Sequence, residues 1–168
     1  MNTQIHWIEG PWPGRLAISP RPRGGEWLKD EIRAWSQSGI DVVVSLLTRD
    51  EIKDLELNEE AELCRAHNIS FISFPIDDLS VPTSRTEALN FVSALHRLLV
   101  EGHRIVIHCR GGIGRSGLLT ASLLVSSGIE PEAAIRQVSD ARGFSVPETA
   151  QQIQWVRDFA DAATALTR

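Results

Sequence analysis

The chain has 168 residues, of which 17 are basic and 22 acidic, for a formal net charge of -5, and 42% of its residues are hydrophobic. This length and composition are typical of one soluble globular domain, and we expect residues 1–168 to form a single domain. The acidic balance argues against a protein that binds nucleic acid through bulk charge, because such binding depends on a basic face.

The sequence also disfavours membrane-spanning and disulfide-stabilised classes. No apolar run reaches the length of a membrane span, and Met1–His6 lack the basic start and apolar core of a secretory signal. Cys64 and Cys109 are too few for a disulfide framework or a cysteine-rich metal site. We therefore expect a cytoplasmic protein with no metal, in a reducing compartment that suits a free thiol.

The first half of the chain alternates short strands and helices. Pro and Gly cluster from Gly10 to Gly25, which predicts a loop-rich N-terminal segment over residues 1–25. The run Asp41–Leu47 is rich in β-branched residues without polar alternation, as expected for a strand buried on both faces, and Ile69–Pro75 is expected to be a second buried strand. In chain order, the predicted elements are a strand at 16–19, a helix at 26–38, a strand at 41–47, a helix at 59–67 and a strand at 69–75.

The second half continues the alternation, and its first helix has the clearest boundaries. Ser84 and Glu87 match a capping box, an apolar stripe follows, and Gly102 ends the helix. Pro131 is expected in the first turn of a later helix. The remaining predicted elements are a strand at 104–108 and helices at 115–127, 131–141 and 147–163.

Strands separated by helices predict an α/β fold, with a central, mostly parallel, twisted sheet of about four to five strands flanked by helices. Ligands of such sheets bind at the carboxyl ends of the strands. The glycine-rich segment after His108 lies at such an end, because it connects the strand at 104–108 directly to the helix at 115–127.

The segment His108–Ser116 has the composition of an anion-binding loop. Its glycines allow successive backbone N–H groups to turn toward one point, and the helix that follows adds its positive N-terminal end there. The Arg115 guanidinium can hold two oxygens of a phosphoryl group. The residues predicted to bind phosphate are Arg110, Gly111, Gly112, Ile113, Gly114 and Arg115.

Cys109 opens this loop and is the predicted nucleophile. A thiol in such a positive field should lose its proton readily, and its thiolate would attack phosphorus to form a cysteinyl-phosphate. His108 is expected to orient the loop through its ring nitrogens. Ser116 can donate a hydrogen bond to the thiolate and help it to leave in the second step. An ordinary glycine-rich turn that happens to contain a cysteine is the alternative, but it does not explain an arginine six residues later.

This loop resembles the Cys-x5-Arg signature of the protein tyrosine and dual-specificity phosphatases, and the resemblance extends from about Gly14 to Phe159. The segments Gly14–Pro20 and Phe74–Pro82 are most similar to the compact branch that includes the cyclin-dependent-kinase-associated (kinase-inhibitor-3-like) phosphatases. The resemblance implies a dual-specificity-phosphatase-like fold, a phosphorylated protein as substrate, and no cofactor.

The same resemblance implies a general acid upstream of the cysteine and a glutamine that positions water. Asp77 and Asp78 stand side by side in the acid segment, and the pattern favours Asp78 as the acid and leaves Asp77 as the reserve. The alternative for each is a turn-forming or helix-capping carboxylate. Gln152, near the start of the last helix, matches the water-positioning glutamine, against a plain solvent-facing glutamine. Arg142 could border the pocket, but a surface arginine is the simpler interpretation.

Differences between this sequence and related enzymes limit the range of expected substrates. The loop has none of the lysines found in lipid phosphatases of the tensin-homologue type, and the chain lacks the insertions that build a deep phosphotyrosine slot. A shallow cleft that admits phosphoserine, phosphothreonine and phosphotyrosine follows from these absences. The alternatives within the fold are a phosphoinositide, a nucleotide or an RNA 5′ end. A rhodanese-like sulfurtransferase and a non-catalytic phosphate-binding module are the alternatives outside it.

Cys64 is a candidate redox partner of Cys109. Some relatives carry a thiol near this position, so the hypothesis is that peroxide drives a Cys64–Cys109 disulfide that protects the nucleophile from overoxidation. The alternative is a small buried apolar side chain.

Overall fold

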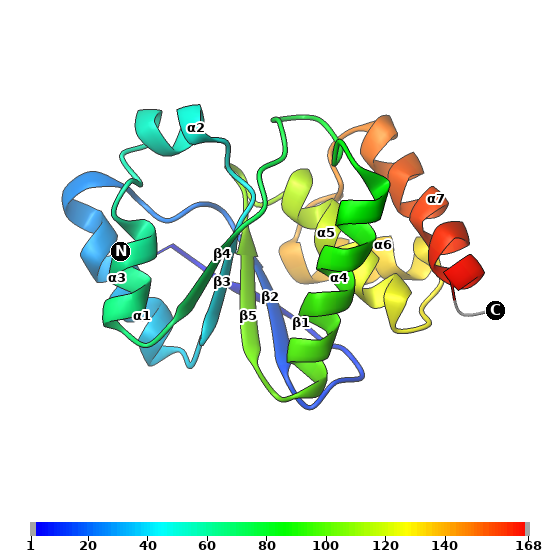
Figure 1. The fold of residues 1–168 in the computed structure, drawn as a ribbon, viewed down its shortest axis with the longest axis horizontal. Coiled ribbons are helices and arrows are strands. Elements are labelled where there is room, and N and C mark those ends of the chain that lie inside the picture. Colours follow the sequence, from blue (N-terminus) through cyan, green and yellow to red (C-terminus); the bar gives the residue numbers. More distant parts are fainter. Residues whose placement is uncertain (1–2, 167–168) are drawn as a thin grey trace.

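The computed structural model describes residues 3–166, and it places a five-stranded sheet between two groups of helices (Figure 1). The order of the strands is β1-β2-β5-β3-β4; β1 runs antiparallel to β2, and every other pair is parallel. The α/β class and the mostly parallel sheet predicted from the sequence are confirmed. The strands are β1 (His6–Ile8), β2 (Arg15–Ser19), β3 (Val42–Ser45), β4 (Ser70–Ser73) and β5 (Arg104–His108).

The helices fall into two groups, one on each side of the sheet (Figure 1). The first group is α1 (Leu28–Gln37), α2 (Arg49–Asp54) and α3 (Glu60–Ala66), preceded by a 3₁₀ turn at Gly25–Trp27. The second group is α4 (Arg85–Val100), α5 (Arg115–Ser126), α6 (Pro131–Arg142) and α7 (Ala150–Leu166). Within residues 3–166, none of the helices combines the length and the apolar character that a membrane span requires.

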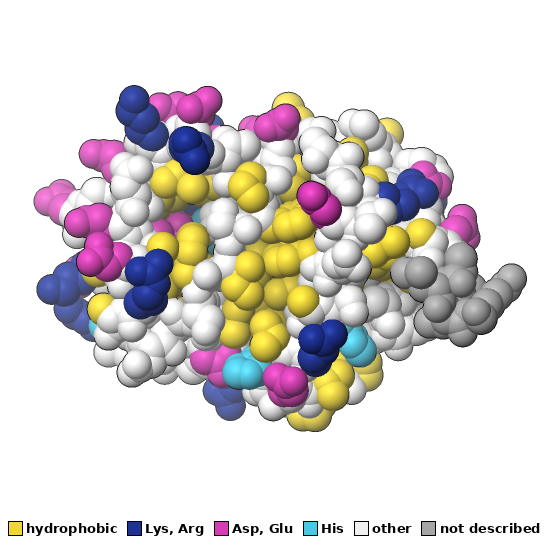
Figure 2. All heavy atoms as spheres, viewed as in Figure 1, with side chains coloured by type: hydrophobic (Ala, Val, Ile, Leu, Met, Phe, Trp, Pro, Cys, Tyr) yellow, Lys and Arg dark blue, Asp and Glu magenta, His cyan; other side chains and the backbone are white. Residues whose placement is uncertain are grey.

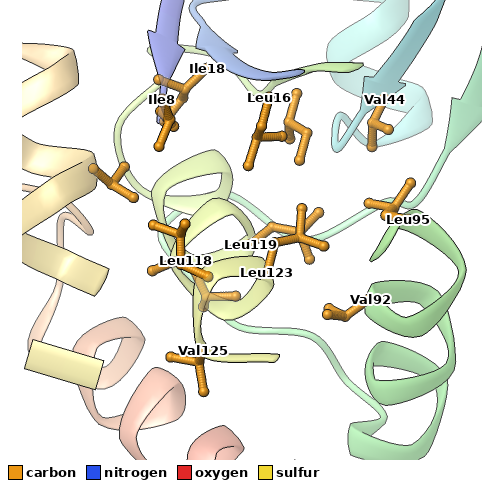
Figure 3. Close-up of a cluster of buried hydrophobic side chains, with 14 of the residues drawn as sticks. Ile8, Leu16, Ile18, Val44, Val92, Leu95, Leu118, Leu119, Leu123 and Val125 are labelled. Atoms are coloured by element: carbon orange, nitrogen blue, oxygen red, sulfur yellow. The ribbon is translucent and has the colours of Figure 1, made fainter. Parts of the chain in front are cut away.

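Two hydrophobic clusters on opposite faces hold the sheet in place, because successive strand residues point to opposite sides. Ala17, Val43 and Val106 face the cluster beneath α1 and α3. Their neighbours along the strands, among them Leu16, Ile18 and Val44, face the larger cluster, where α4 and α5 pack on the sheet (Figure 3). Each fully buried aliphatic side chain stabilises the fold by roughly 1.5–3 kcal/mol. The central strands are therefore the most firmly held part of the fold.

Strand β4 differs from its prediction as a strand buried on both faces. It is an edge strand, and its side chains are exposed or only partly buried. Beyond the strand, Phe74 stacks on Phe91 of α4, with ring centroids 4.3 Å apart. A band of hydrophobic side chains is visible between β4 and α4, while acidic and basic side chains are interspersed around it (Figure 2). A short apolar run does not distinguish an edge strand from a central one, so this prediction was wrong.

Two short elements were not predicted. β1 lies within the segment expected to be loop-rich, and its three residues are too few to show a period. Helix α2 has only six residues, but its start is marked: Thr48 and Glu51 form a complete capping box. By contrast, only one half of the box expected at Ser84 is present, where Ser84 Oγ accepts a hydrogen bond from the Glu87 N–H at 3.2 Å.

Candidate active site

The glycine-rich loop lies where β5 ends, between the ends of β2 and β3. The Leu46 N–H donates to the His108 carbonyl at 3.0 Å, which ties the start of the loop to the chain just after β3. Gly112 has a φ of 68°, and a Cβ placed on it would lie 2.4 Å from the backbone nitrogen of Pro20. The loop and the segment after β2 therefore pack so closely that only glycine fits at this position.

Cys109 lies at the base of a pocket of about 220 Å³. Its side chain is almost completely buried, and its Sγ is 3.2 Å from the Ser116 Oγ on α5. The hydroxyl can therefore donate to a thiolate, as the sequence predicts. The residues that line the pocket are Asp78, Leu79, Cys109, Arg110, Gly111, Ile113, Gly114, Arg115 and Glu148.

The guanidinium of Arg115 is buried beside the cysteine and anchored on several sides. Glu51 accepts two hydrogen bonds from it, Nη1 to Oε2 and Nη2 to Oε1, each of 2.8 Å. Nη1 also donates to the Ile76 carbonyl at 2.8 Å, and Nη2 to the Asp78 Oδ1 at 3.1 Å. Burial alone would lower the pKa of Arg115, but the hydrogen bond to Glu51 and the nearby charge of Cys109 outweigh it and raise the pKa.

Glu51 is a site residue that sequence analysis missed. It is the third residue of α2, and its carboxylate both completes the capping box and holds Arg115. Burial opposes the charged form of Glu51, but hydrogen bonds from Arg115 and Thr48 lower its pKa overall. The capping pattern predicts the start of a helix, yet nothing local in the sequence indicates that its carboxylate faces an arginine 64 residues away.

Replacing Glu51 with glutamine should destabilise the protein by about 1–3 kcal/mol near neutral pH, because a buried guanidinium loses its charged partner. Because its pKa is lowered, ionised Glu51 stabilises the fold at pH values above its ordinary pKa of 4.5. This contribution is lost as the pH falls through the lowered pKa. Urea unfolding of Glu51→Gln and wild type should therefore differ most near neutral pH and converge in acid. The exposed neighbour provides the control, Asp50→Asn, and an equal loss in both variants would contradict this role.

A buried carboxylate also contacts His108. The His108 Nε2 is 2.6 Å from the Glu60 Oε1, and the His108 Nδ1 is 3.2 Å from the Cys109 carbonyl oxygen. A carbonyl oxygen can only accept, so Nδ1 must carry a proton, and a second proton must lie between Nε2 and Glu60. The pair as a whole is then uncharged, wherever the second proton resides. Both ring nitrogens of His108 have partners, and its part in orienting the loop stays a prediction. Sequence analysis missed Glu60.

The two neighbouring aspartates have different surroundings. Asp78 lines the pocket, and its Oδ1 accepts from Arg115 and from the Leu79 N–H at 3.0 Å. Both aspartates are exposed, but Asp77 is not among the residues that line the pocket, and its carbonyl accepts from the Ser80 N–H within the same turn. Leu79, which also lines the pocket, has a positive φ of 62°, a conformation that leucine rarely adopts. This placement favours Asp78 as the general acid.

Gln152 is completely buried, so its interpretation as a solvent-facing glutamine was wrong. Its Oε1 accepts from the N–H groups of Glu148 and Thr149, each at 3.1 Å. Its Nε2 donates to the Ser80 carbonyl at 2.9 Å. The amide thus connects the turn that carries Asp78 to the start of α7. Its proposed part in positioning water stays a prediction.

Cys64 lies in the hydrophobic cluster beneath α1 and α3, whereas Cys109 belongs to the cluster on the other face of the sheet. Burial, with a smaller contribution from the charge of Glu60, raises the pKa of Cys64 to about 12. A protonated, buried thiol is poorly suited to exchange. The disulfide hypothesis stays a prediction, and this conformation favours the alternative of a small buried apolar side chain.

A cysteine at the base of a strand-loop-helix cup, beside a buried arginine and an aspartate-bearing turn, is the arrangement of the cysteine-dependent phosphatases. The family model described as "Polymorphic toxin system, DSP-PTPase phosphatase" (Tc-R-P) matches residues 19–129, a stretch that contains Cys109 and Arg115. The chain belongs to this DSP-PTPase phosphatase family.

Curated relatives and solved structures agree with this assignment. The chain is 31% identical to cyclin-dependent kinase inhibitor 3 of Rattus norvegicus over 130 residues, which cover 76% of this chain and 61% of that protein. It is 38% identical over 90 residues to a protein of Invertebrate iridescent virus 6 named as a tyrosine phosphatase, covering 51% of this chain and 32% of the relative. The chain thus spans only part of the curated relatives that it matches.

The structure of kinase associated phosphatase, solved with its catalytic cysteine replaced by serine, shares the fold with a TM-score of 0.90 at 23% identity, covering 98% of both chains. A structure of Tk-PTP in the active form has a TM-score of 0.74 at 25% identity, covering 88% of this chain and 92% of that one. The resemblance to the compact kinase-associated phosphatases is confirmed.

Proposed function

We propose that this chain is a phosphoric monoester hydrolase that dephosphorylates phosphotyrosine, phosphoserine and phosphothreonine in proteins through a cysteinyl-phosphate intermediate. The observation that carries the proposal is the placement of the Cys109 Sγ at the base of the pocket, 3.2 Å from the Ser116 Oγ and beside the buried Arg115 guanidinium. A thiolate there has an anion-binding loop around it and a hydroxyl donor behind it.

In the first half of the reaction, the phosphoryl group binds the loop amides and Arg115, and the Cys109 thiolate attacks phosphorus. The bond from phosphorus to the ester oxygen breaks, and Asp78 donates its proton to that oxygen. A phosphoryl group that takes up the Arg115 Nη2 replaces the Asp78 contact seen here, which releases the carboxyl group to face the leaving oxygen.

In the second half, a water molecule attacks the cysteinyl-phosphate and gives its proton to the Asp78 carboxylate. The sulfur leaves as a thiolate, which the hydroxyl of Ser116 stabilises by donating a hydrogen bond. Gln152 could help to place the water once its Nε2 leaves the Ser80 carbonyl, with which it is paired here.

A protein substrate is favoured by the character of the pocket and by the relatives. The exposed, apolar Leu79 lies beside the phosphate site, and the loop has no lysine to attract a second phosphate. This chemistry suits the side chain of a phosphorylated residue better than an inositol polyphosphate. The curated relatives named above are a kinase inhibitor and a protein named as a tyrosine phosphatase. A reducing compartment such as the cytoplasm would keep the catalytic thiol active.

The protein should hydrolyse para-nitrophenyl phosphate without added metal, and best on the acidic side of neutrality, where the thiolate and the protonated aspartate coexist. Vanadate should inhibit this activity, whereas chelators should leave it unchanged. A steady-state assay across pH, with and without a chelator, checks these expectations. Loss of activity on chelation would contradict the metal-free mechanism, and thiosulfate turnover without phosphatase activity would favour the sulfurtransferase.

Panels of phosphopeptides and phosphoinositides should separate the protein substrate from its alternatives. We expect turnover of the peptides to exceed that of the lipids at equal concentration. The reverse order would reassign the substrate without changing the catalytic residues.

A further inference from the structure

The phosphate-binding loop has an outer face as well as an inner one. When successive N–H groups turn toward a bound anion, the carbonyl oxygens of the same segment turn away and need donors of their own. Three of these carbonyl oxygens accept hydrogen bonds from neighbouring groups. The His108 oxygen accepts from the Leu46 N–H, the Cys109 oxygen from the His108 ring, and the Arg110 oxygen from the Arg21 N–H.

Gly111 and Gly112 supply the next two carbonyls, and both are bound by one side chain. The Arg142 Nε donates to the Gly112 oxygen at 3.0 Å, and its Nη2 donates to the Gly111 oxygen at 3.2 Å. Arg142 is the last residue of α6, 30 residues beyond the loop. It reaches the loop from outside the pocket, whose lining residues are those given above.

The guanidinium is itself held in place. Its Nη1 is 3.2 Å from the His6 Nε2 on β1, and because a guanidinium only donates, this nitrogen must be the acceptor and His6 must be neutral. Burial, and then the charge of Arg142, lower the pKa of His6, in keeping with a neutral ring. After α6, Gly143 takes a left-handed conformation with a φ of 84°. The ring of Phe144 then lies against the guanidinium, with its centroid 5.0 Å from the Arg142 Cζ.

We propose that Arg142 is a positioning residue of the phosphate site, an inference that rests on the proposed function. Its planar guanidinium holds the Gly111 and Gly112 carbonyls outward and thereby keeps the loop amides turned toward the phosphoryl group. Two parallel N–H donors with fixed geometry are needed for two successive carbonyls, and a lysine ammonium cannot reproduce that geometry. Loss of these two donors allows the loop to shift, and a shift of about 1 Å can cost on the order of 100-fold in rate.

The test measures tungstate binding by calorimetry, together with kcat and KM for para-nitrophenyl phosphate, in wild type, Arg142→Lys and Arg142→Gln. We expect tungstate to bind roughly ten- to a hundredfold more weakly and kcat/KM to fall by a similar factor, with both variants affected alike. Arg136→Gln, on the exposed face of the same helix, should match wild type. His6→Phe keeps the two Arg142 donors to the loop but removes the third partner of the guanidinium, so the fall in tungstate affinity and in kcat/KM should be smaller than in the Arg142 variants.

Two outcomes would overturn the proposal. If Arg142→Lys binds tungstate as tightly as wild type, then only a positive charge is needed and the planar pair of donors has no role. If Arg142→Gln and His6→Phe lower the melting temperature but leave tungstate affinity and kcat/KM unchanged, then Arg142 only stabilises the fold. Failure of the proposed function would appear separately, as a wild type that binds tungstate but turns over no phosphate ester.

Discussion

The Cys109→Ser protein should lose turnover by a factor on the order of 10⁴ or more while it still binds tungstate or a phosphopeptide. The hydroxyl of serine does not ionise in the range where a thiolate forms, so attack on phosphorus stops. The loop amides and the anchored Arg115 do not depend on the sulfur, so the anion should still bind. Steady-state kinetics measure the first quantity, and calorimetry measures the second.

The second cysteine gives a matched control for this experiment. Cys64 is buried in the cluster on the other face of the sheet, so Cys64→Ala should retain turnover. Substantial turnover by Cys109→Ser would remove Cys109 as the nucleophile. A phosphoryl group found covalently bound to Cys109 in wild type, and absent from the serine variant, would identify the sulfur directly.

The Asp78→Asn protein should lose roughly a hundred- to ten-thousandfold in kcat, because a general acid contributes about that much to a reaction step. The loss should depend on the leaving group. A poor leaving group such as phenol needs the proton, whereas nitrophenol leaves with much less help. We therefore expect the loss to be larger for phenyl phosphate than for para-nitrophenyl phosphate, as measured in parallel steady-state assays.

The adjacent aspartate is the natural control for general acid catalysis. Asp77→Asn changes an exposed side chain outside the pocket lining and removes the same charge, so its effect should be much milder. Equal losses in the two variants would show that the negative charge of the turn matters rather than the proton of Asp78. A larger loss in Asp77→Asn would transfer the role to the residue held in reserve.

The segment from β5 through the loop to α5 could be predicted from the sequence because its signals are local. A β-branched strand, a glycine-rich turn and an apolar helical segment follow one another within a few residues, so the order strand, loop, helix can be predicted from this stretch alone. The class of fold follows in the same way from the alternation of strands and helices. The burial of β4 could not be predicted, because the position of a strand within a sheet depends on the other strands.

The residues that support the site were harder to find for the same reason. Glu51, Glu60 and Arg142 contact the loop or its arginine from 64, 48 and 30 residues away. Each is a charged residue in its own helix, and even the capping box that contains Glu51 gives no sign of the distant group that this carboxylate contacts. Sequence reasoning therefore located the groups proposed to react with phosphate, but it missed Glu51 and Glu60 and preferred to interpret Arg142 as a surface residue.

The proposed nucleophile and the proposed acid lie on parts of the fold that differ in stiffness. Cys109 follows β5, which is paired on both sides and buried along most of its length. Asp78 stands on an exposed turn after the edge strand β4. Segments with fewer buried contacts open more readily than the core. An inhibitor that fills only the pocket around Cys109 therefore binds a rigid part of the fold. One that extends toward Leu79 contacts a segment that can change its shape. Selectivity among related enzymes is best sought in contacts with that segment.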